Sequence, residues 1–498
     1  MKKIIVITML AASMISCKKF LAERSQTDVI PKTTKDFGEI LYTDGYPTGN
    51  KLLQPYLALM DDDIQVYNGP TIADNQAAVF MNAGAFQWQP DFIEVCARAG
   101  SPDKMNFNSW RSYYQLILGT NVALQYLDNS IGSNTEKAMY KGEAYALRAF
   151  YHFMLVNLYA KPYNDSTTTP DKSPGIPLKL DANLSESFPA RNTVKEVYAQ
   201  VTQDLDSAIY LLDQVKSDQQ LYRFSHVAAH LLASRVYLYM EQWDKVIEHA
   251  DYVLSYHPQL MDLNDWGGEA DASTKPVIGA YNIETIWYYG SVKEQTPAGG
   301  DVCYDVSHDL ANCYEANDLR TLIYFVATPS ILKIFIPNDF VNRKMTDPYG
   351  AKADMGSSWR SSEAYLNRAE AYIQKYKTKG DAGAAAEALN SLNTLRARRI
   401  DKASFANWTL QTPDVLLEMC RTERRRELSK ECGHRWFDLR RYGMPAIKHI
   451  FTPDINATSV YELQARDPQY VIPIPTDVLQ RNMSLMQNQQ VSGVRLPE

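Results

Sequence analysis

The highest density of chemically active side chains lies in Arg421–Gly443, RTERRRELSKECGHRWFDLRRYG, which holds seven arginines in a chain of formal charge -7. Such a segment could be a nucleic-acid patch, an anion-binding active site or an internal latch. Glu423 and Glu427 lie one helical turn apart, where two carboxylates repel unless cations neutralise them. A phosphate-binding patch would not require acids among its arginines. We therefore interpret the segment as a latch, in which Arg424–Arg426 neutralise both glutamates.

Arrangements elsewhere that could support catalysis or metal binding are weak. The sequence has no GxSxG elbow, HExxH motif or Walker loop, although the paired carboxylates of a glycosidase follow no local spacing rule and stay open. Asp61–Asp63 could bind calcium or form a solvated loop end, and no EF-hand pattern follows them. His226 and His230 lie at i,i+4 without a third ligand, as ordinary helix residues do. We predict no catalytic residue, no metal and no cofactor.

Aromatic and polar residues occur together in several loop segments. A pyranose offers a C–H face to an aromatic ring and a rim of hydroxyls to amides and charged groups, so a sugar site needs both kinds of residue together. FQWQPDF and DLNDWGGEAD have that mixture, and Tyr67-Asn68 and Tyr304-Asp305 are weaker copies of it. We predict ligand contacts at Trp88, Trp266, Tyr67, Asn68 and Tyr304. The alternative for each residue is a ring that anchors its loop to the core.

The clearest periodic segment is Ser225–Pro258, which has the spacing of a 34-residue helix–turn–helix repeat. Small Ser234 would let two helices approach, and Tyr237 and Trp243 would fill the wedge between them. The segment resembles a tetratricopeptide repeat. Looser helical pairs recur along the chain, which predicts an all-α chassis.

Between the helical pairs the sequence is rich in Pro, Gly, Asn, Asp and aromatic residues, with only short strand-like runs such as ETIWYYG. Loops this long in a compact chain are usually functional or covered by partners. We expect a single body, 17–498, with helical repeats at about 105–160, 193–258 and 358–445, irregular ligand-facing segments at about 61–108, 163–190 and 259–354, and a C-terminal tail at 446–498.

The N-terminus has the layout of an export signal. Lys2 and Lys3 precede the apolar run Ile4–Ala12, which is shorter than the roughly 20 residues that a membrane-spanning helix needs. Ser16-Cys17 resembles a lipoprotein box, so we predict cleavage of residues 1–16 and acylation of Cys17; the alternative is an ordinary signal. The pairing of the remaining cysteines stays open: Cys96, Cys303, Cys313, Cys420 and Cys432.

Several motifs together carry a family resemblance. ERRREL followed by GHRWFDLRRYG resembles the C-terminal signature of the SusD/RagB family of Bacteroidetes outer-membrane lipoproteins, with Cys432 standing where the family usually has Glu. CKKFLAERSQTDVIPKT and GEAYALRAFYHFMLVNLYA resemble the family's mature N-terminus and early helix. RAEAYI with LNTLRARR, and YVIPIPTDVLQRNMSLMQNQ, resemble its late helix pair and tail, so the resemblance extends over most of the chain.

The resemblance implies a tetratricopeptide-containing binding protein, lipid-anchored on the outer membrane and facing the cell exterior. It would cap a SusC-like TonB-dependent transporter and deliver glycans, or peptides in an alternative role, and it would not be an enzyme. Ligand-contacting aromatics differ among family members, so no residue list transfers. The residues leave two different functions open, a secreted glycoside-active enzyme and a peptide-holding scaffold. The export signal argues against a nucleic-acid partner.

Overall fold

The computed structural model describes residues 31–48, 51–66, 73–100, 107–183, 188–216, 221–265, 277–294, 303–328, 339–344, 355–454 and 457–498. Helices dominate this part of the chain. The main ones are α5 (Ser109–Tyr126), α6 (Asn134–Tyr159), α7 (Val194–Val215), α8 (His226–Tyr239), α9 (Trp243–Tyr256), α14 (Ser361–Lys379), α15 (Ala382–Arg396) and α16 (Pro413–Leu428), which the short α17 (His434–Arg441) follows.

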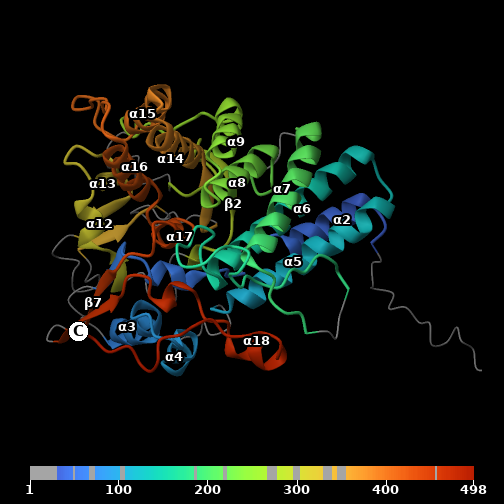
Figure 1. The fold of residues 1–498 in the computed structure, drawn as a ribbon, viewed down its shortest axis with the longest axis horizontal. Helices are drawn as coiled ribbons and strands as arrows, with labels where there is room; N and C mark the ends of the chain where they lie inside the picture. The colour runs from blue at the N-terminus through green and yellow to red at the C-terminus, as the bar shows by residue number, and fades with distance from the viewer. Residues whose placement is uncertain are drawn as a thin grey trace, which may run out of the picture.

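These helices form one stack. Each helix from α5 to α9 packs against the next, α14 packs against α9, and both α15 and α16 pack against α14. In Figure 1 the stack runs from α5, α6 and α7 on the right to α14, α15 and α16 at the upper left. The mostly helical, tetratricopeptide-like architecture predicted from the repeat spacing is confirmed.

Local signals in the sequence set the ends of the helices. Ser133 and Glu136 form a capping box at the start of α6, and Thr193 and Glu196 form another at the start of α7. Each box satisfies backbone N–H groups that a helix leaves without a partner. Gly380 ends α14 at φ 66°, a left-handed conformation that glycine adopts without a steric penalty.

The α8–α9 pair has the predicted repeat packing. Ser234 and Tyr237 are buried on α8, and the ring of Tyr237 lies parallel to that of His249 on α9 at 5.5 Å between centroids. Trp243, at the start of α9, is partly buried against the same core. Asn367 on α14 donates a hydrogen bond to Ser234 Oγ at 2.8 Å, which ties this pair to the next one.

Strands are short in the described residues and form antiparallel pairs outside the helical stack. In the pair that contains the run ETIWYYG, Trp287 lies opposite Trp359. The pairs are β1 (Ile64–Val66) with β3 (Tyr304–Val306), β2 (Thr285–Tyr289) with β6 (Ser357–Arg360), β4 (Phe325–Ala327) with β5 (Phe340–Asn342), and β7 (Ile447–Asp454) with β8 (Ala457–Leu463).

The main core lies where the helical stack meets these strands. The ring of Phe150 on α6 packs edge-on against Trp359 at 5.2 Å and against Trp287 at 5.7 Å between centroids. Phe224, just before α8, packs against both tryptophans. Edge-to-face packing is a preferred geometry for aromatic pairs, so this group joins β2 and β6 firmly to α6.

The irregular segments contain more regular structure than their composition predicted. Two helices, α3 (Ala73–Phe86) and α4 (Phe92–Arg98), lie within the segment expected at 61–108, and the β7–β8 hairpin lies in the expected tail. Alanines in α3 favour a helix. The composition of the whole segment 61–108 conceals this preference, because the residues around α3 dominate it. Shorter elements are α2 (Thr34–Ile40), η2 (Leu41–Gly45), η3 (Pro55–Leu59), η5 (Leu127–Asn129), η6 (Val292–Glu294), α12 (His308–Asn312), α13 (Arg320–Ile323), η8 (Pro468–Tyr470) and α18 (Thr476–Arg481).

A glycine on α5 allows one close helix contact. A Cβ atom built on Gly119 would lie 2.4 Å from the backbone carbonyl carbon of Asp44 in η2. Gly119→Ala should therefore lower the free energy of unfolding by about 1–3 kcal/mol, measured by chemical denaturation. Gly383→Ala on α15 is the control, because only the side chain of Asp381 lies near its Cβ, at 3.2 Å, and alanine favours a helix. Equal losses in the two variants would contradict this packing argument.

Candidate ligand-binding surface

Two of the aromatic residues predicted to contact ligand are core residues. Trp88 has no exposed surface; its indole Nε1 donates to the Met60 carbonyl at 2.8 Å and its ring stacks on His449 at 4.0 Å. Tyr304 is buried on β3, donates its hydroxyl to the Val79 carbonyl and packs against a neighbouring ring. Neither ring offers a face to a ligand, so the structure corrects both predictions. Polar neighbours in the sequence did not keep these rings at the surface, because His449 on β7 stacks on Trp88, and Phe86 and Val79 on α3 contact Tyr304.

The remaining predicted contacts, Tyr67, Asn68 and Trp266, lie outside the described residues, as does the predicted acylation site Cys17. Their roles stay predictions. Within the ranges that the structure describes, no helix has the length and apolar character needed to cross a membrane.

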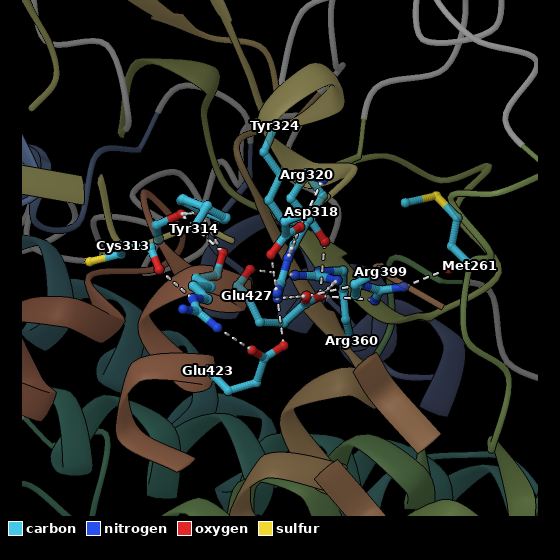
Figure 2. Close-up of polar contacts among 12 residues, drawn as sticks. Met261, Cys313, Tyr314, Asp318, Arg320, Tyr324, Arg360, Arg399, Glu423 and Glu427 are labelled. Atoms are coloured by element: carbon cyan, nitrogen blue, oxygen red, sulfur yellow. Dashed lines mark hydrogen bonds and ion pairs between the residues drawn. The ribbon is translucent and has the colours of Figure 1, made fainter. Parts of the chain in front are cut away.

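The centre of the arginine segment is a buried carboxylate, Glu427 (Figure 2). Arg399 donates to both of its oxygens at 2.9 Å, Arg360 donates at 2.8 Å and Arg320 at 3.1 Å. The hydroxyl of Tyr324 adds another hydrogen bond at 2.9 Å. Burial alone would raise the pKa of Glu427, but Arg399 and Arg360 lower it well below its usual value.

This Glu427 cluster joins distant parts of the chain. Arg320 belongs to α13, Arg360 ends β6, and Arg399 follows α15, while Glu427 itself lies on α16. Arg360 and Arg399 also bind the buried carboxylate of Glu284 at 2.8 and 2.6 Å. We call the strands and loops outside the helical stack the irregular face. The cluster therefore fixes this face to the helical stack.

The latch interpretation is confirmed, but with partners that differ from those predicted. Arg424–Arg426 were expected to neutralise both glutamates, but of these three only Arg426 contacts Glu423, at 3.4 Å. Arg320 also binds Glu423, at 2.9 Å, and Glu427 is neutralised from remote segments. Arg424 instead binds Asp438 on α17 at 2.8 Å. The guanidinium is suited to such sites because it stays charged and offers several fixed donors.

The aspartate run at Asp61–Asp63 is part of the same latch and not a solvated loop end. Arg435 binds Asp62 through two hydrogen bonds at 2.6 and 2.7 Å, and Arg425 binds Asp63 at 2.7 Å. Burial, together with the neighbouring Asp63, raises the pKa of Asp61 to about 7. These carboxylates fix the segment that leads into β1 onto α16 and α17.

The histidines and cysteines form no metal-binding group in the part of the chain that the structure describes. His230 Nδ1 lies 2.9 Å from Nδ1 of His249, and His226 Nδ1 lies 3.0 Å from the hydroxyl of Tyr252. These rings pack between α8 and α9. Within the described residues, none of five cysteines is in a disulfide bond: Cys96, Cys303, Cys313, Cys420 and Cys432.

An open groove of about 710 Å³ lies where the loop after α6 meets the C-terminal tail. We call it the C-terminal groove. Its lining comes from the loop after α6, from Ala190 and Arg191 before α7, from the loop after β8 and from the tail after α18. Its volume suits an oligosaccharide segment, since ligand pockets usually measure about 300–1,000 Å³. Apolar Met444, Val471 and Met486 lie in it beside charged residues and amides.

Arg191 holds the walls of the C-terminal groove together. Its Nε donates to the Gly175 carbonyl at 2.6 Å, and its Nη2 donates to the carbonyls of Tyr159 and Pro174 at 2.7 and 3.0 Å. Its Nη1 donates to Asn488 Oδ1 at 2.8 Å. One guanidinium thus joins α6, the loop after it and the C-terminal tail, which makes the groove a fixed feature of the fold.

An aromatic ring that the sequence analysis missed is Tyr281, whose side chain is 87% exposed in the loop before β2. The side chain of Asn282 fixes the backbone of this loop. Its amide nitrogen donates to the Val277 carbonyl at 2.8 Å, and its amide oxygen accepts from the backbone N–H of Glu284 at 2.9 Å. The Tyr–Asn pair is the same signal that singled out Tyr67 and Asn68, so it could have been found from sequence. The C-terminal groove could not, because its residues come from distant segments.

The fold and this surface define a class of protein: a tetratricopeptide-like helical stack that carries a grooved, irregular face. Two family models match the chain, one described as "Starch-binding associating with outer membrane" over residues 20–238 and one described as "SusD family" over residues 281–490. Between them they match most of its length. The chain belongs to the SusD/RagB family, as its motifs indicated.

Curated relatives and solved structures agree with this assignment. SusD-like protein P25 of Formosa agariphila is 22% identical over 556 residues, which cover 98% of each chain. SusD-like protein P38 of the same organism is 28% identical over 160 residues, 31% of this chain and only 28% of that protein. A solved SusD-like carbohydrate binding protein from Bacteroides vulgatus shares the fold at a TM-score of 0.65 and 20% identity, covering 93% of this chain and 99% of its own. A solved laminarin binding SusD-like protein shares the fold at a TM-score of 0.62 and 20% identity, covering 91% of this chain and 98% of its own.

Glu427→Gln should be strongly destabilising, because it leaves three buried guanidinium groups without their shared charge. The free energy of unfolding at pH 7 should fall by about 3–5 kcal/mol. The pKa of Glu427 is lower in the folded than in the unfolded chain, so its contribution is present above about pH 4.3 and is lost as the pH falls through the folded pKa. The difference between wild type and variant, measured by chemical denaturation, should therefore shrink below about pH 4.

The control for this prediction is Asp414→Asn, which removes an exposed ion pair with Lys377. Exposed pairs contribute little to stability, so this variant should unfold like the wild type. A Glu427→Gln variant as stable as Asp414→Asn would show that the Glu427 cluster does not hold the irregular face in place.

Proposed function

We propose that the protein is a cell-surface lipoprotein that binds glycans and delivers them to a SusC-like TonB-dependent transporter in the outer membrane. The observation that carries this proposal is the fold: a laminarin binding protein and a carbohydrate binding protein share it over more than 90% of this chain. Family membership and the description of the first family model support the outer-membrane setting.

The surface chemistry fits a sugar ligand. The exposed ring of Tyr281 offers a flat face to the C–H groups of a pyranose, and its hydroxyl can bond to a sugar hydroxyl. The C-terminal groove offers amides at Gln487 and Gln489 beside the apolar surface of Met486. Both features are held by hydrogen bonds between a side chain and the backbone, from Asn282 beside Tyr281 and from Arg191 in the groove, so a ligand would meet a surface that is already ordered.

The carboxylates of the C-terminal groove favour binding over glycoside hydrolysis. Asp165 pairs with Arg466 at 3.0 Å, and Asp467 pairs with Arg495 at 2.9 Å. Burial opposes ionisation of Asp165, yet hydrogen bonds from Thr167 lower its pKa. A glycosidase needs one carboxyl group with a raised pKa as its general acid. The pKa of Asp165 is shifted in the opposite direction.

Binding to a polysaccharide panel that includes laminarin, measured by affinity electrophoresis beside a peptide panel, tests the proposed function. We expect retardation by at least one glycan. Tyr281→Ala should weaken that binding by about 0.5–1.5 kcal/mol, taking aromatic pairs as the scale. Tyr210→Ala, which removes a ring that is 69% exposed on α7, is the control and should bind normally. Binding to peptides and to no glycan would establish the peptide-binding alternative instead.

Acylation of Cys17 is tested separately. Wild-type protein expressed in a bacterial host should incorporate radiolabelled palmitate and sediment with membranes, since two or more acyl chains give stable anchoring. Cys17→Ala should incorporate none and stay in the soluble fraction. A Cys17→Ala variant that still sediments with membranes would rule out the lipid anchor.

A further inference from the structure

The C-terminal groove combines a net positive charge with a chain that is acidic as a whole. In the described residues its lining contains the cations Lys161, Arg191 and Arg466 and the carboxylates Asp165 and Asp467. Asp467 is already bound at 2.9 Å by a further cation, Arg495. The charge of the groove therefore differs in sign from that of the protein, which favours anions at this place.

Arg191 supplies a positive charge that no acid neutralises. All of its hydrogen bonds go to carbonyl groups and one amide oxygen, and no carboxylate pairs with it within the described ranges. Burial lowers the pKa of Arg191 to about 10, so the group stays charged at neutral pH. Because its N–H groups are occupied, Arg191 attracts an anion through its field and does not bind one directly.

Lys161 supplies the direct contact. It is exposed at the edge of the groove and donates a hydrogen bond to Thr167 Oγ1 at 3.0 Å. An ammonium group has three donors, so Lys161 can bind an incoming anion without losing that bond. Met486, 79% exposed, presents apolar surface in the same groove, which suits the C–H face of a sugar ring.

We propose that the C-terminal groove is a subsite for acidic sugars, in which Lys161 binds a carboxylate or sulfate substituent and Arg191 provides the surrounding positive field. This inference rests on the proposed function, because it names the class of glycan that one site would accept. Neutral sugars would gain nothing from either cation.

Matched oligosaccharides test the subsite on the full mature chain. The probes are oligogalacturonides, neutral galacto-oligosaccharides of the same length, and sulfated galacto-oligosaccharides, each titrated by calorimetry. We expect at least one acidic probe to bind about tenfold more tightly than the neutral one, with affinity that falls as salt is raised. The two acidic arms distinguish a carboxylate from a sulfate. Equal affinity for acidic and neutral probes would overturn the inference.

Two further measurements locate the binding. Lys161→Glu should lower the affinity for the acidic probe about tenfold or more, whereas Lys402→Glu, at an exposed lysine elsewhere, should not. In methyl-labelled protein the Met486 signal should shift on titration with the acidic probe, and that of Met419 on α16 should not. Unchanged affinity in Lys161→Glu, or an unchanged Met486 signal, would overturn the inference.

The failure of this inference is distinguishable from failure of the proposed function. A chain that binds neutral glycans without preferring acidic ones contradicts only the acidic subsite. A chain that binds no glycan contradicts both.

Discussion

The structure depends on one buried interaction, the convergence of Arg320, Arg360 and Arg399 on Glu427. The three arginines come from segments that share no regular element, and hydrophobic packing alone would not specify how these segments meet. A buried charge is costly unless its partners are in place, so the cluster tolerates one arrangement of the segments. It thus orients the irregular face relative to the helical stack, with Asp61–Asp63 and the arginines of α16 and α17 as a second contact.

Because of this constraint, the helical stack and the irregular face are stabilised in different ways. The helical stack is stabilised by repeated packing of neighbouring helices, which needs little information from distant residues. The irregular face has short strands that would be unstable alone, since a two-stranded sheet is marginal in water. It is ordered because aromatic packing at Trp287 and Trp359 and the Glu427 cluster attach it to the stack.

Sequence alone predicted the features that short-range patterns determine. The repeat at Ser225–Pro258 lies within 34 consecutive residues, and the charge alternation around Glu423 lies within one or two helical turns. The structure confirms the helix pair and an ion pair between Arg426 and Glu423. Partners from far along the chain were not predictable, which is why Arg320, Arg360 and Arg399 were missed and why Arg424 and Arg425 were given the wrong acids. The burial of Trp88 and Tyr304 was missed for the same reason, because residues far away in the sequence, His449 for Trp88 and Phe86 for Tyr304, pack against their rings.

In the loop before β2, one residue fixes the backbone and its neighbour is exposed to solvent. Asn282 makes the hydrogen bonds that fix the turn, while the neighbouring Tyr281 extends into solvent. Replacement of the tyrosine therefore changes the presented chemistry without disturbing the turn beneath it. Single substitutions at such a position would change the surface chemistry offered to the proposed ligand, while the architecture stays recognisable between relatives that share about a fifth of their residues.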